Sequence, residues 1–294
     1  MSDVIASPSV RARAGEMGID LARRAAELGR KSIALEDLDG ASGAAAAPVP
    51  GDRSYWDVDH AAYGPVTTEP MSRIAQIAAK NLAAAQALIP AVTHHDRADV
   101  SAVEAMRARL KAEAEARGVR LTALAFHVKA LARALRAFSR FNASLSPDGE
   151  TLVLKGYVHI GIAVDTAHGL LVPVLRDADQ KGLWAIAAEI GDLAARAQGR
   201  KLKAGEMGGA SMTISNLGGV GGAAFTPIVN PPEVAILGLT RTETVTLWED
   251  GVPKPVPMVP LDLSYDHRVI NGADAARFLA YHARLIADPR RIML

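Results

Sequence analysis

Two short segments carry residue types that proton transfer and acyl transfer require. The segment SYDHRVINGADAARF, residues 264–278, places His267 in a predicted loop between a strand ending near Tyr265 and a helix, and Asn271 follows four residues later. An imidazole in such a loop can accept a proton as a general base, and a nearby amide can help to hold its loop in place. The same spacing is equally typical of a partly exposed loop histidine with no chemical role.

The second segment is SMTISNLGGVGGAAF, residues 211–225. Ser215 ends a predicted strand and enters a glycine-rich turn, where its hydroxyl could donate to a developing oxyanion or, more commonly, cap the turn. Gly219, Gly221 and Ala224 also fit a loose dinucleotide-binding pattern. That pattern needs a helix directly after the glycines, and the proline-rich FTPIVNPP follows instead, so we reject it.

A third segment, THHDRAD, residues 93–99, contains possible metal ligands. Neighbouring residues of a strand point to opposite faces, so His94 and His95 would not converge on one ion. The segment therefore indicates an exposed polar strand end, and we expect no metal. His159 lies in a predicted strand and is expected to be structural.

Helices and strands follow one another in blocks, which favours an α+β sandwich with a mixed sheet over a doubly wound fold. A hairpin is predicted from 157–166 and 170–177, because the turn residues AHG separate two β-rich runs. By periodicity and turn residues, we expect helices near 71–88, 101–117, 121–139, 182–199 and 273–287, and further strands near 211–216, 233–239, 243–248 and 256–265.

The composition predicts three parts. Residues 3–38 form a small charged unit with two short helices, near 8–18 and 33–38, the first capped by Ser7. A unit of this size buries little surface and is marginal alone. Residues 39–65 contain GASGAAAAPVPG and are expected to be a linker. Residues 66–294 are steadily globular.

Charge and cysteine content exclude several classes of function. The chain has 294 residues, 33 basic and 32 acidic, for a net charge of +1. This balance argues against nucleic acid or a membrane surface as partner. There is no cysteine, so thiol chemistry would need a thiol carried by a substrate. No run of about 18 apolar residues and no signal peptide is present, so we expect a cytoplasmic protein.

Several motifs together resemble the catalytic domain of the dihydrolipoyl acyltransferase component of 2-oxo acid dehydrogenase complexes. They are VHIGIAVDTAHGLLVPV, TISNLGG, AFTPIVNPPEVAILG and DHRVINGADAARF, within a likeness that runs over residues 66–294. The asparagine in the last motif is most similar to the bacterial acetyltransferases of the pyruvate dehydrogenase complex. The resemblance implies a chloramphenicol-acetyltransferase-like two-layer sandwich and a homotrimer, which can build a larger cage; the end RRIML is similar to the family's cage-forming tail.

The resemblance also implies roles for individual residues. His267 would take the proton from a thiol, Ser215 of the neighbouring subunit would hydrogen-bond the oxyanion, and Asn271 would support the reacting geometry. Phe225 and Leu237 would line the acyl and lipoyl region. Coenzyme A and a dihydrolipoyl arm would enter from opposite sides, each bringing its own thiol, and no metal would be needed.

Two further expectations concern charged groups. Asp165, expected near the substrate channel, would form a structural ion pair with Arg107. The first 38 residues resemble the family's peripheral-subunit-binding domain, and Arg11 matches one of its binding arginines. The family's glycine-rich basic loop is replaced by AELGRKSI, residues 26–33, which is a candidate for an added helical turn. Docking of the decarboxylase and the dihydrolipoyl dehydrogenase is therefore left open.

The family carries lipoyl domains ahead of this unit, and the sequence contains none. We therefore expect the lipoyl group to be supplied in trans, by lipoyl domains on other chains or by free dihydrolipoamide, unless the chain is a shortened form. The leading hypothesis is an acyltransferase, most favourably for acetyl. The alternatives are a non-catalytic structural core or adaptor, and an acyltransferase with a different acceptor.

Overall fold

The computed structural model describes residues 4–16, 19–39 and 58–293. The chain divides into two compact units, Met1–Glu69 and Pro70–Leu294. We describe each unit by itself. The glycine- and alanine-rich part of the expected linker lies outside the described residues, as does the expected helix end at Gly18.

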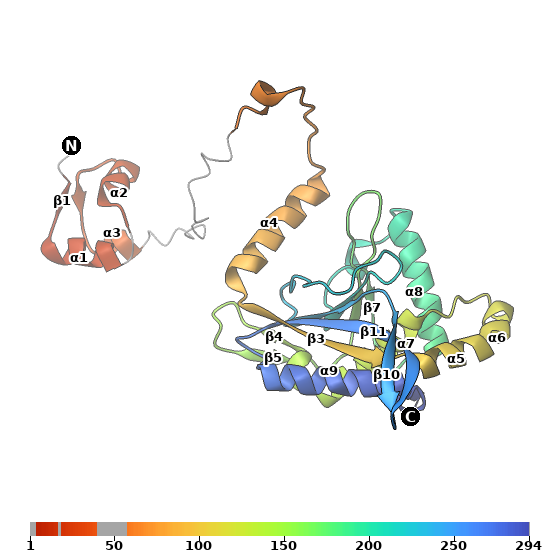
Figure 1. The fold of residues 1–294 in the computed structure, drawn as a ribbon. Coiled ribbons are helices and arrows are strands. Elements are labelled where there is room, and N and C mark those ends of the chain that lie inside the picture. Colours follow the sequence, from red (N-terminus) through yellow and green to blue (C-terminus); the bar gives the residue numbers. More distant parts are fainter. Residues whose placement is uncertain (1–3, 17–18, 40–57, 294) are drawn as a thin grey trace. The chain divides into compact units, whose positions relative to one another are not determined.

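The described residues of the first unit contain three short helices and one pair of strands (Figure 1). The helices are α1 (Pro8–Glu16), α2 (Leu21–Glu27) and α3 (Glu36–Asp39), and β1 (Ile5–Ala6) pairs in parallel with β2 (Ser32–Ile33). A 3-10 turn, η2 (His60–Tyr63), lies further along this unit. The unit buries a small core of Val10, Ala14, Ala25, Ile33 and Leu38.

Two expectations for the first unit need correction. The sequence predicted two helices and missed α2, whose first turn is capped where Asp20 Oδ1 accepts a hydrogen bond of 2.8 Å from the Ala22 N–H. The segment 26–33 has not become helical as a whole, because α2 ends at Glu27 and the strand β2 begins at Ser32. The predicted Ser7 cap is confirmed, since Ser7 Oγ accepts from the Val10 N–H at 3.3 Å.

A mixed seven-stranded sheet forms the centre of the second unit. Its order is β10-β11-β9-β8-β6-β7, and β3 also pairs with β11. The pairs β6–β8 and β8–β9 are parallel and the others antiparallel, which confirms the predicted mixed sheet. The strands are β3 (Ala91–Asp99), β6 (Ile160–Ile162), β7 (Val174–Leu175), β8 (Met212–Asn216), β9 (Ala235–Leu239), β10 (Glu243–Glu249) and β11 (Val252–Asp266); β4 (Ala143–Leu145) and β5 (Leu152–Leu154) form a separate ribbon.

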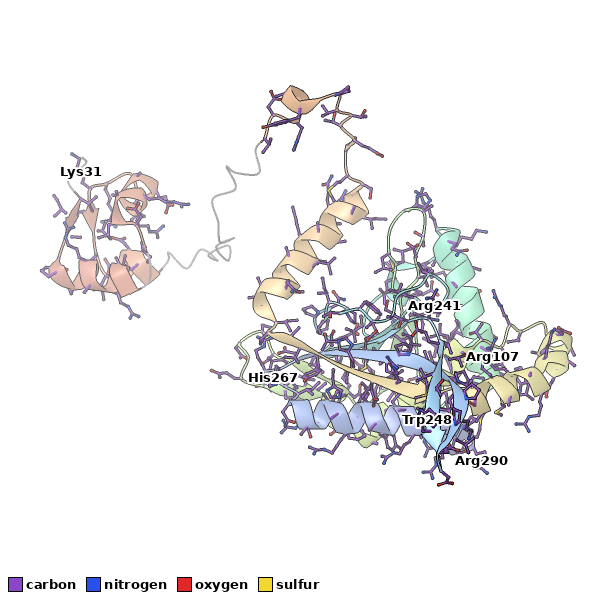
Figure 2. The ribbon with its side chains drawn as sticks, viewed as in Figure 1. Lys31, Arg107, Arg241, Trp248, His267 and Arg290 are labelled. Carbon is purple, nitrogen blue, oxygen red and sulfur yellow. The ribbon has the colours of Figure 1, made fainter. Side chains whose placement is uncertain are left out.

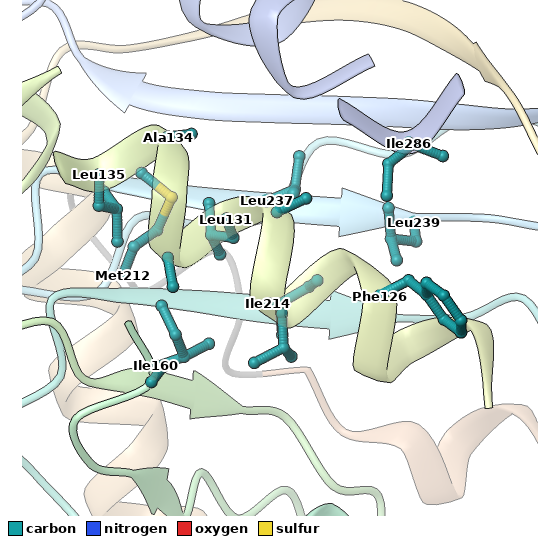
Figure 3. Packing of buried hydrophobic residues seen from close by; sticks show 14 of the residues in the cluster. Phe126, Leu131, Ala134, Leu135, Ile160, Met212, Ile214, Leu237, Leu239 and Ile286 are labelled. Atoms are coloured by element: carbon teal, nitrogen blue, oxygen red, sulfur yellow. The ribbon is translucent and has the colours of Figure 1, made fainter. Parts of the chain in front are cut away.

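Helices cover one face of this sheet (Figure 3). The apolar stripe of α7 lies against side chains from β6, β8 and β9, and Ile286 of α9 closes the same cluster. The predicted hairpin is confirmed as β6 and β7, but the predicted helix over 101–117 is broken at Leu110. The helices of the second unit are α4 (Arg73–Leu88), α5 (Ser101–Arg109), α6 (Lys111–Ala116), α7 (Ala123–Ala137), α8 (Leu183–Gln198), α9 (Gly272–Ala287) and α10 (Arg290–Met293), with 3-10 turns η3 (Ser139–Phe141) and η4 (Ala204–Glu206).

The opposite face of the sheet is polar. Side chains of a strand alternate between the two faces, so Thr213, Ser215, Asp262 and Ser264 point away from the helices. We call these residues the polar face. Its cover within the chain is the segment 217–234, which follows β8, together with the last turn of α4. The contact between them is a small apolar cluster of Ala85, Ile89, Val229 and Ile236.

Much of the apolar surface of α4 is exposed in the described chain. Exposed apolar side chains occur from the first turn of the helix to its last, at Ile74, Ile77, Leu82 and Leu88, and Met71 lies just before its N-cap. The helix stands away from the sheet except at its C-terminal end (Figure 1). No helix of the described chain is both long and apolar enough to cross a membrane.

Candidate functional site

His267 lies in the turn between β11 and α9, as the sequence predicted. The turn is held by the carboxylate of Asp266, which accepts from the Arg268 N–H at 3.0 Å and forms an ion pair of 2.7 Å with its guanidinium. The His267 N–H donates to the carbonyl of Pro90 at 3.1 Å. The backbone on both sides of the imidazole is therefore fixed.

The His267 side chain is exposed, and its ring nitrogens have no hydrogen bond among the described residues. Its ring lies 5.9 Å from the ring of Tyr265, tilted by 32°. Asn271 ends the same turn, and its Oδ1 accepts from the Asp274 N–H at 2.8 Å, which makes Asn271 the N-cap of α9. The arrangement leaves one imidazole free to exchange a proton on a rigid turn.

Ser215 is the next-to-last residue of β8 and belongs to the polar face. Its side chain is half-buried, and its hydroxyl has no hydrogen-bond partner in the described part of the chain. The glycine-rich turn begins directly after it, where Asn216 Oδ1 accepts from the Gly218 N–H at 2.9 Å. Asn216, rather than Ser215, thus caps the turn, and the Ser215 hydroxyl remains available to a ligand.

One chain does not bring Ser215 and His267 together. The strand register pairs Ser215 with Gly238 and Gly238 with Asp262, and β11 continues from there to Asp266 beside His267. With strands spaced about 5 Å apart and residues about 3.3 Å apart, Ser215 and Asp266 are separated by about 10 Å across the sheet and about 13 Å along it. A site that uses both side chains therefore needs a second copy of the chain.

Phe225 lies beside Ser215, over the middle strand β9. A Cβ atom on Gly238 would come within 2.5 Å of Phe225 Cε1, so the ring packs directly on the glycine backbone. Because Gly238 is the register partner of Ser215, the ring borders the serine on the polar face. The structure thus brings Phe225 and Ser215 together.

Leu237 and the expected Asp165–Arg107 pair need correction. Leu237 is fully buried in the core on the helix-covered face, opposite to Ser215, so it cannot line a site on the polar face in this chain (Figure 3). Arg107 instead pairs with Glu104 at 2.6 Å and donates to the carbonyl of Leu121, far from His267 (Figure 2). Asp165 is exposed in the hairpin loop between β6 and β7.

Sequence reasoning missed one buried carboxylate on the polar face. Asp262 is fully buried, and its Oδ1 lies 2.6 Å from Nδ1 of His95 on the neighbouring strand. The period of two indicates which residues share a face, but only the register between distant strands places these two opposite each other. His94 is directed to the other face, opposite Leu263, and no cluster of three metal-ligating side chains occurs among the described residues.

The chain is similar to solved acyltransferase cores. One comes from a crystallographic and enzymatic study of a serine, a histidine and an asparagine in the catalytic mechanism of Azotobacter vinelandii dihydrolipoamide acetyltransferase: it is 51% identical, covers 81% of this chain and 98% of that one, and has a TM-score of 0.79. The cubic core of a pyruvate dehydrogenase multienzyme complex matches equally well, with the same coverage. The fold and the histidine turn thus define an acyltransferase domain.

The chain belongs to the family of 2-oxoacid dehydrogenases acyltransferase (catalytic domain), whose model matches residues 63–294. Similar curated proteins are dihydrolipoyllysine-residue acetyltransferase components of pyruvate dehydrogenase complexes. Those of Cupriavidus necator and Pseudomonas aeruginosa are 44% identical over 98% and 99% of this chain, and that of Azotobacter vinelandii is 46% identical over 99%. The chain spans 55%, 55% and 47% of their lengths, respectively.

Proposed function

We propose that this chain transfers an acyl group, acetyl above others, between coenzyme A and a dihydrolipoyl group. The observation that carries the proposal is the pair of unengaged groups, the exposed imidazole of His267 on a fixed turn and the free hydroxyl of Ser215 at a strand end. A base and an oxyanion donor are the two groups that thioester exchange requires. The identity to acetyltransferase components supports acetyl as the group transferred.

The reaction balances with these two residues. His267 accepts the proton of the incoming thiol, and the thiolate attacks the thioester carbonyl. The carbonyl oxygen becomes negatively charged, and the Ser215 hydroxyl donates a hydrogen bond to it. When the intermediate collapses, the carbon–sulfur bond of the old thioester breaks, and the leaving thiolate takes the proton back from the His267 imidazolium. Asn271, as the N-cap of α9, fixes the position of the His267 turn relative to that helix.

We infer that the working unit is a homotrimer with its sites between subunits. Within one chain the two groups are too far apart, so Ser215 must act with His267 of another copy. The exposed apolar stripe of α4 supports the same conclusion, because a helix of this kind needs an apolar surface to cover it. The similarity to a cubic core supports further assembly of trimers into a cage.

The lipoyl group and the other components of a complex are part of the same proposal. Free dihydrolipoamide or a lipoyl domain on another chain would serve as the acyl partner. Arg11 is a poor candidate for binding another component of a complex, because its guanidinium already donates hydrogen bonds within the first unit. Its partners are the carbonyls of Val4 at 2.8 Å and Ala6 at 3.2 Å.

The test is acyl transfer from acetyl-CoA to free dihydrolipoamide by wild type, Ser215→Ala and His267→Ala. We expect each substitution to lower the rate by roughly 100-fold or more, because each removes one group from the transition state. His60→Ala, an exposed histidine outside the catalytic unit, is the matched control and should keep full activity. Absence of transfer by a folded wild-type oligomer, tested with acetyl-, succinyl- and isobutyryl-CoA, would favour a structural core or adaptor instead.

A further inference from the structure

Four residues from four neighbouring strands form one row across the polar face, and the proposed oxyanion donor Ser215 stands at one end of it. The register pairs Ser215 of β8 with Gly238 of β9, Gly238 with Asp262 of β11, and Asp262 with His95 of β3. Paired residues of neighbouring strands project to the same side of a sheet. Asp262 and His95 therefore lie on the same face as Ser215, two and three strands away.

The ring of Phe225 fills the space between Ser215 and Asp262. Only a glycine at position 238 leaves room for it, since a Cβ atom there would meet Phe225 Cε1 at 2.5 Å and Cζ at 2.7 Å. Phe225 belongs to the loop after β8, outside any helix or strand, so its own backbone does not hold the ring in place. Its position depends on contacts with the strands beneath.

The Asp262 carboxylate accepts a hydrogen bond from the backbone of Phe225 itself. Its Oδ2 accepts a hydrogen bond of 3.3 Å from the Phe225 N–H, and its Oδ1 lies 2.6 Å from His95 Nδ1. The Asp262 side chain is 1% exposed, whereas that of His95 is 50% exposed. A buried carboxylate is costly unless it is fully hydrogen-bonded, so its two partners hold it and it holds the Phe225 backbone in return.

We propose that Asp262, oriented by His95, is a positioning residue that fixes Phe225 as the wall of the acyl site next to Ser215. The proposal rests on the proposed function for the identity of the acyl site, but the tether between Asp262 and Phe225 does not. Loss of the tether lets the ring leave Gly238 and widens the space beside the Ser215 hydroxyl. The consequence is a change in which acyl group is accepted, in addition to any change in rate.

The experiment compares acetyl- and butyryl-CoA as donors to dihydrolipoamide for wild type, Asp262→Ala, His95→Ala and Phe225→Ala. We expect the ratio of butyryl to acetyl kcat/KM to rise by about tenfold in Phe225→Ala and Asp262→Ala, and less in His95→Ala, as is typical when a wall of an apolar pocket is removed. Asp262→Asn keeps an acceptor for the Phe225 N–H and should restore most of the wild-type selectivity.

Thr93→Ala is the matched control. The Thr93 hydroxyl bonds to Ser264 at 2.7 Å between the same two strands, on the same face, without touching Phe225. It should leave the selectivity ratio unchanged. The double variant Phe225→Ala/Asp262→Ala should show no more change in the ratio than Phe225→Ala alone, because the two residues act through one contact.

Hydrogen exchange of the peptide that contains Phe225 tests the tether without any activity. Its exchange should accelerate in Asp262→Ala and not in Thr93→Ala. Equal losses with both acyl donors, additive effects in the double variant, or unchanged exchange at Phe225 would each overturn the proposal. If wild type transfers no acyl group at all, the proposed function fails, and the exchange result still decides whether Asp262 holds Phe225.

Discussion

Thr213 donates a hydrogen bond of 2.9 Å to Glu233, and both side chains are buried beneath the cover of the polar face. Burial raises the pKa of the Glu233 carboxyl to about 7, although the Thr213 hydroxyl and the nearby charge of Lys155 act in the opposite direction. The second carboxylate oxygen has no partner among the described residues. Glu233 in the folded chain is therefore mostly protonated below about pH 7 and charged above it.

Glu233→Gln should make the folded protein less sensitive to alkaline pH. A raised pKa in the folded state contributes stability that is fully present below the unfolded value, near 4.5, and is lost as the pH rises through about 7. At pH 8 we expect the variant to be more stable than wild type by up to about 3 kcal/mol, and at pH 4 by little. Urea unfolding at the two pH values measures this, with the exposed Glu150→Gln as control. An equal gain in stability at both pH values would contradict the prediction.

The buried pair His127 and His282 should produce the opposite pH dependence. The Nδ1 of His127 lies 3.1 Å from Nε2 of His282, between α7 and α9. Burial lowers the pKa of His127 to about 4, and burial with the neighbouring His127 lowers the pKa of His282 well below its usual value. Both rings are therefore neutral in the folded chain at neutral pH.

Stability that depends on a lowered pKa is present above the unfolded value, near 6.5, and is lost as the pH falls toward 4. We expect wild type to lose about 3 kcal/mol from His127 alone over this range. The double variant His127→Leu/His282→Leu should have a flatter stability profile between pH 7 and pH 4.5, measured by urea unfolding. A slope as steep as that of wild type would show that other groups control acid unfolding.

Gly238→Ala should disturb the proposed site without removing any polar group. The new methyl would overlap the Phe225 ring, and overpacking of this kind typically costs 1–3 kcal/mol, so about 2 kcal/mol is expected. Phe225→Leu in the same chain should recover part of the lost stability, because the smaller side chain makes room. Thermal unfolding of the single and double variants measures this recovery. If the double variant is as unstable as Gly238→Ala alone, the strain does not come from overlap with the Phe225 ring.

Mixed oligomers should complement two inactive chains. Ser215→Ala and His267→Ala each destroy one group, but an interface between one chain of each kind can combine an intact serine with an intact histidine. Random assembly of equal amounts should restore about a quarter of wild-type activity, since each intact group is present with a chance of one half. Co-refolding followed by the acetyl-CoA assay measures this; no recovery in a well-mixed oligomer would mean that one chain supplies both groups.

The elements were predictable where the local pattern determines them. Strand β8, the His267 turn and helix α9 follow from apolar periodicity and turn residues, and they lie within a few residues of their predicted bounds. The break between α5 and α6 at Leu110 was not predictable, because no glycine or proline marks it in the sequence. Helix α2 was missed although Asp20 is a typical cap.

The contacts between distant segments were not predictable in the same way. Arg107 forms its ion pair with Glu104, three residues away, instead of with Asp165. Many carboxylates could pair with one guanidinium, and only the folded structure determines which of them lies close enough. Asp262 and His95 meet through a register between strands far apart in sequence, and a shift of one residue would place them on opposite faces. The orientation of Leu237 follows in the same way from the registers of β9 with β8 and β11.

The exposed apolar stripe of α4 also sets a kinetic condition on assembly. A single folded chain exposes these side chains to any apolar surface that it encounters, and the proposed contact with another copy would remove them from water. Recovery of activity after dilution from denaturant should therefore pass through an optimum in protein concentration. Below this concentration, folded chains rarely meet and few oligomers form. Above it, partly folded chains aggregate before they assemble. The yield of active protein is therefore limited by the rate at which chains meet as much as by folding.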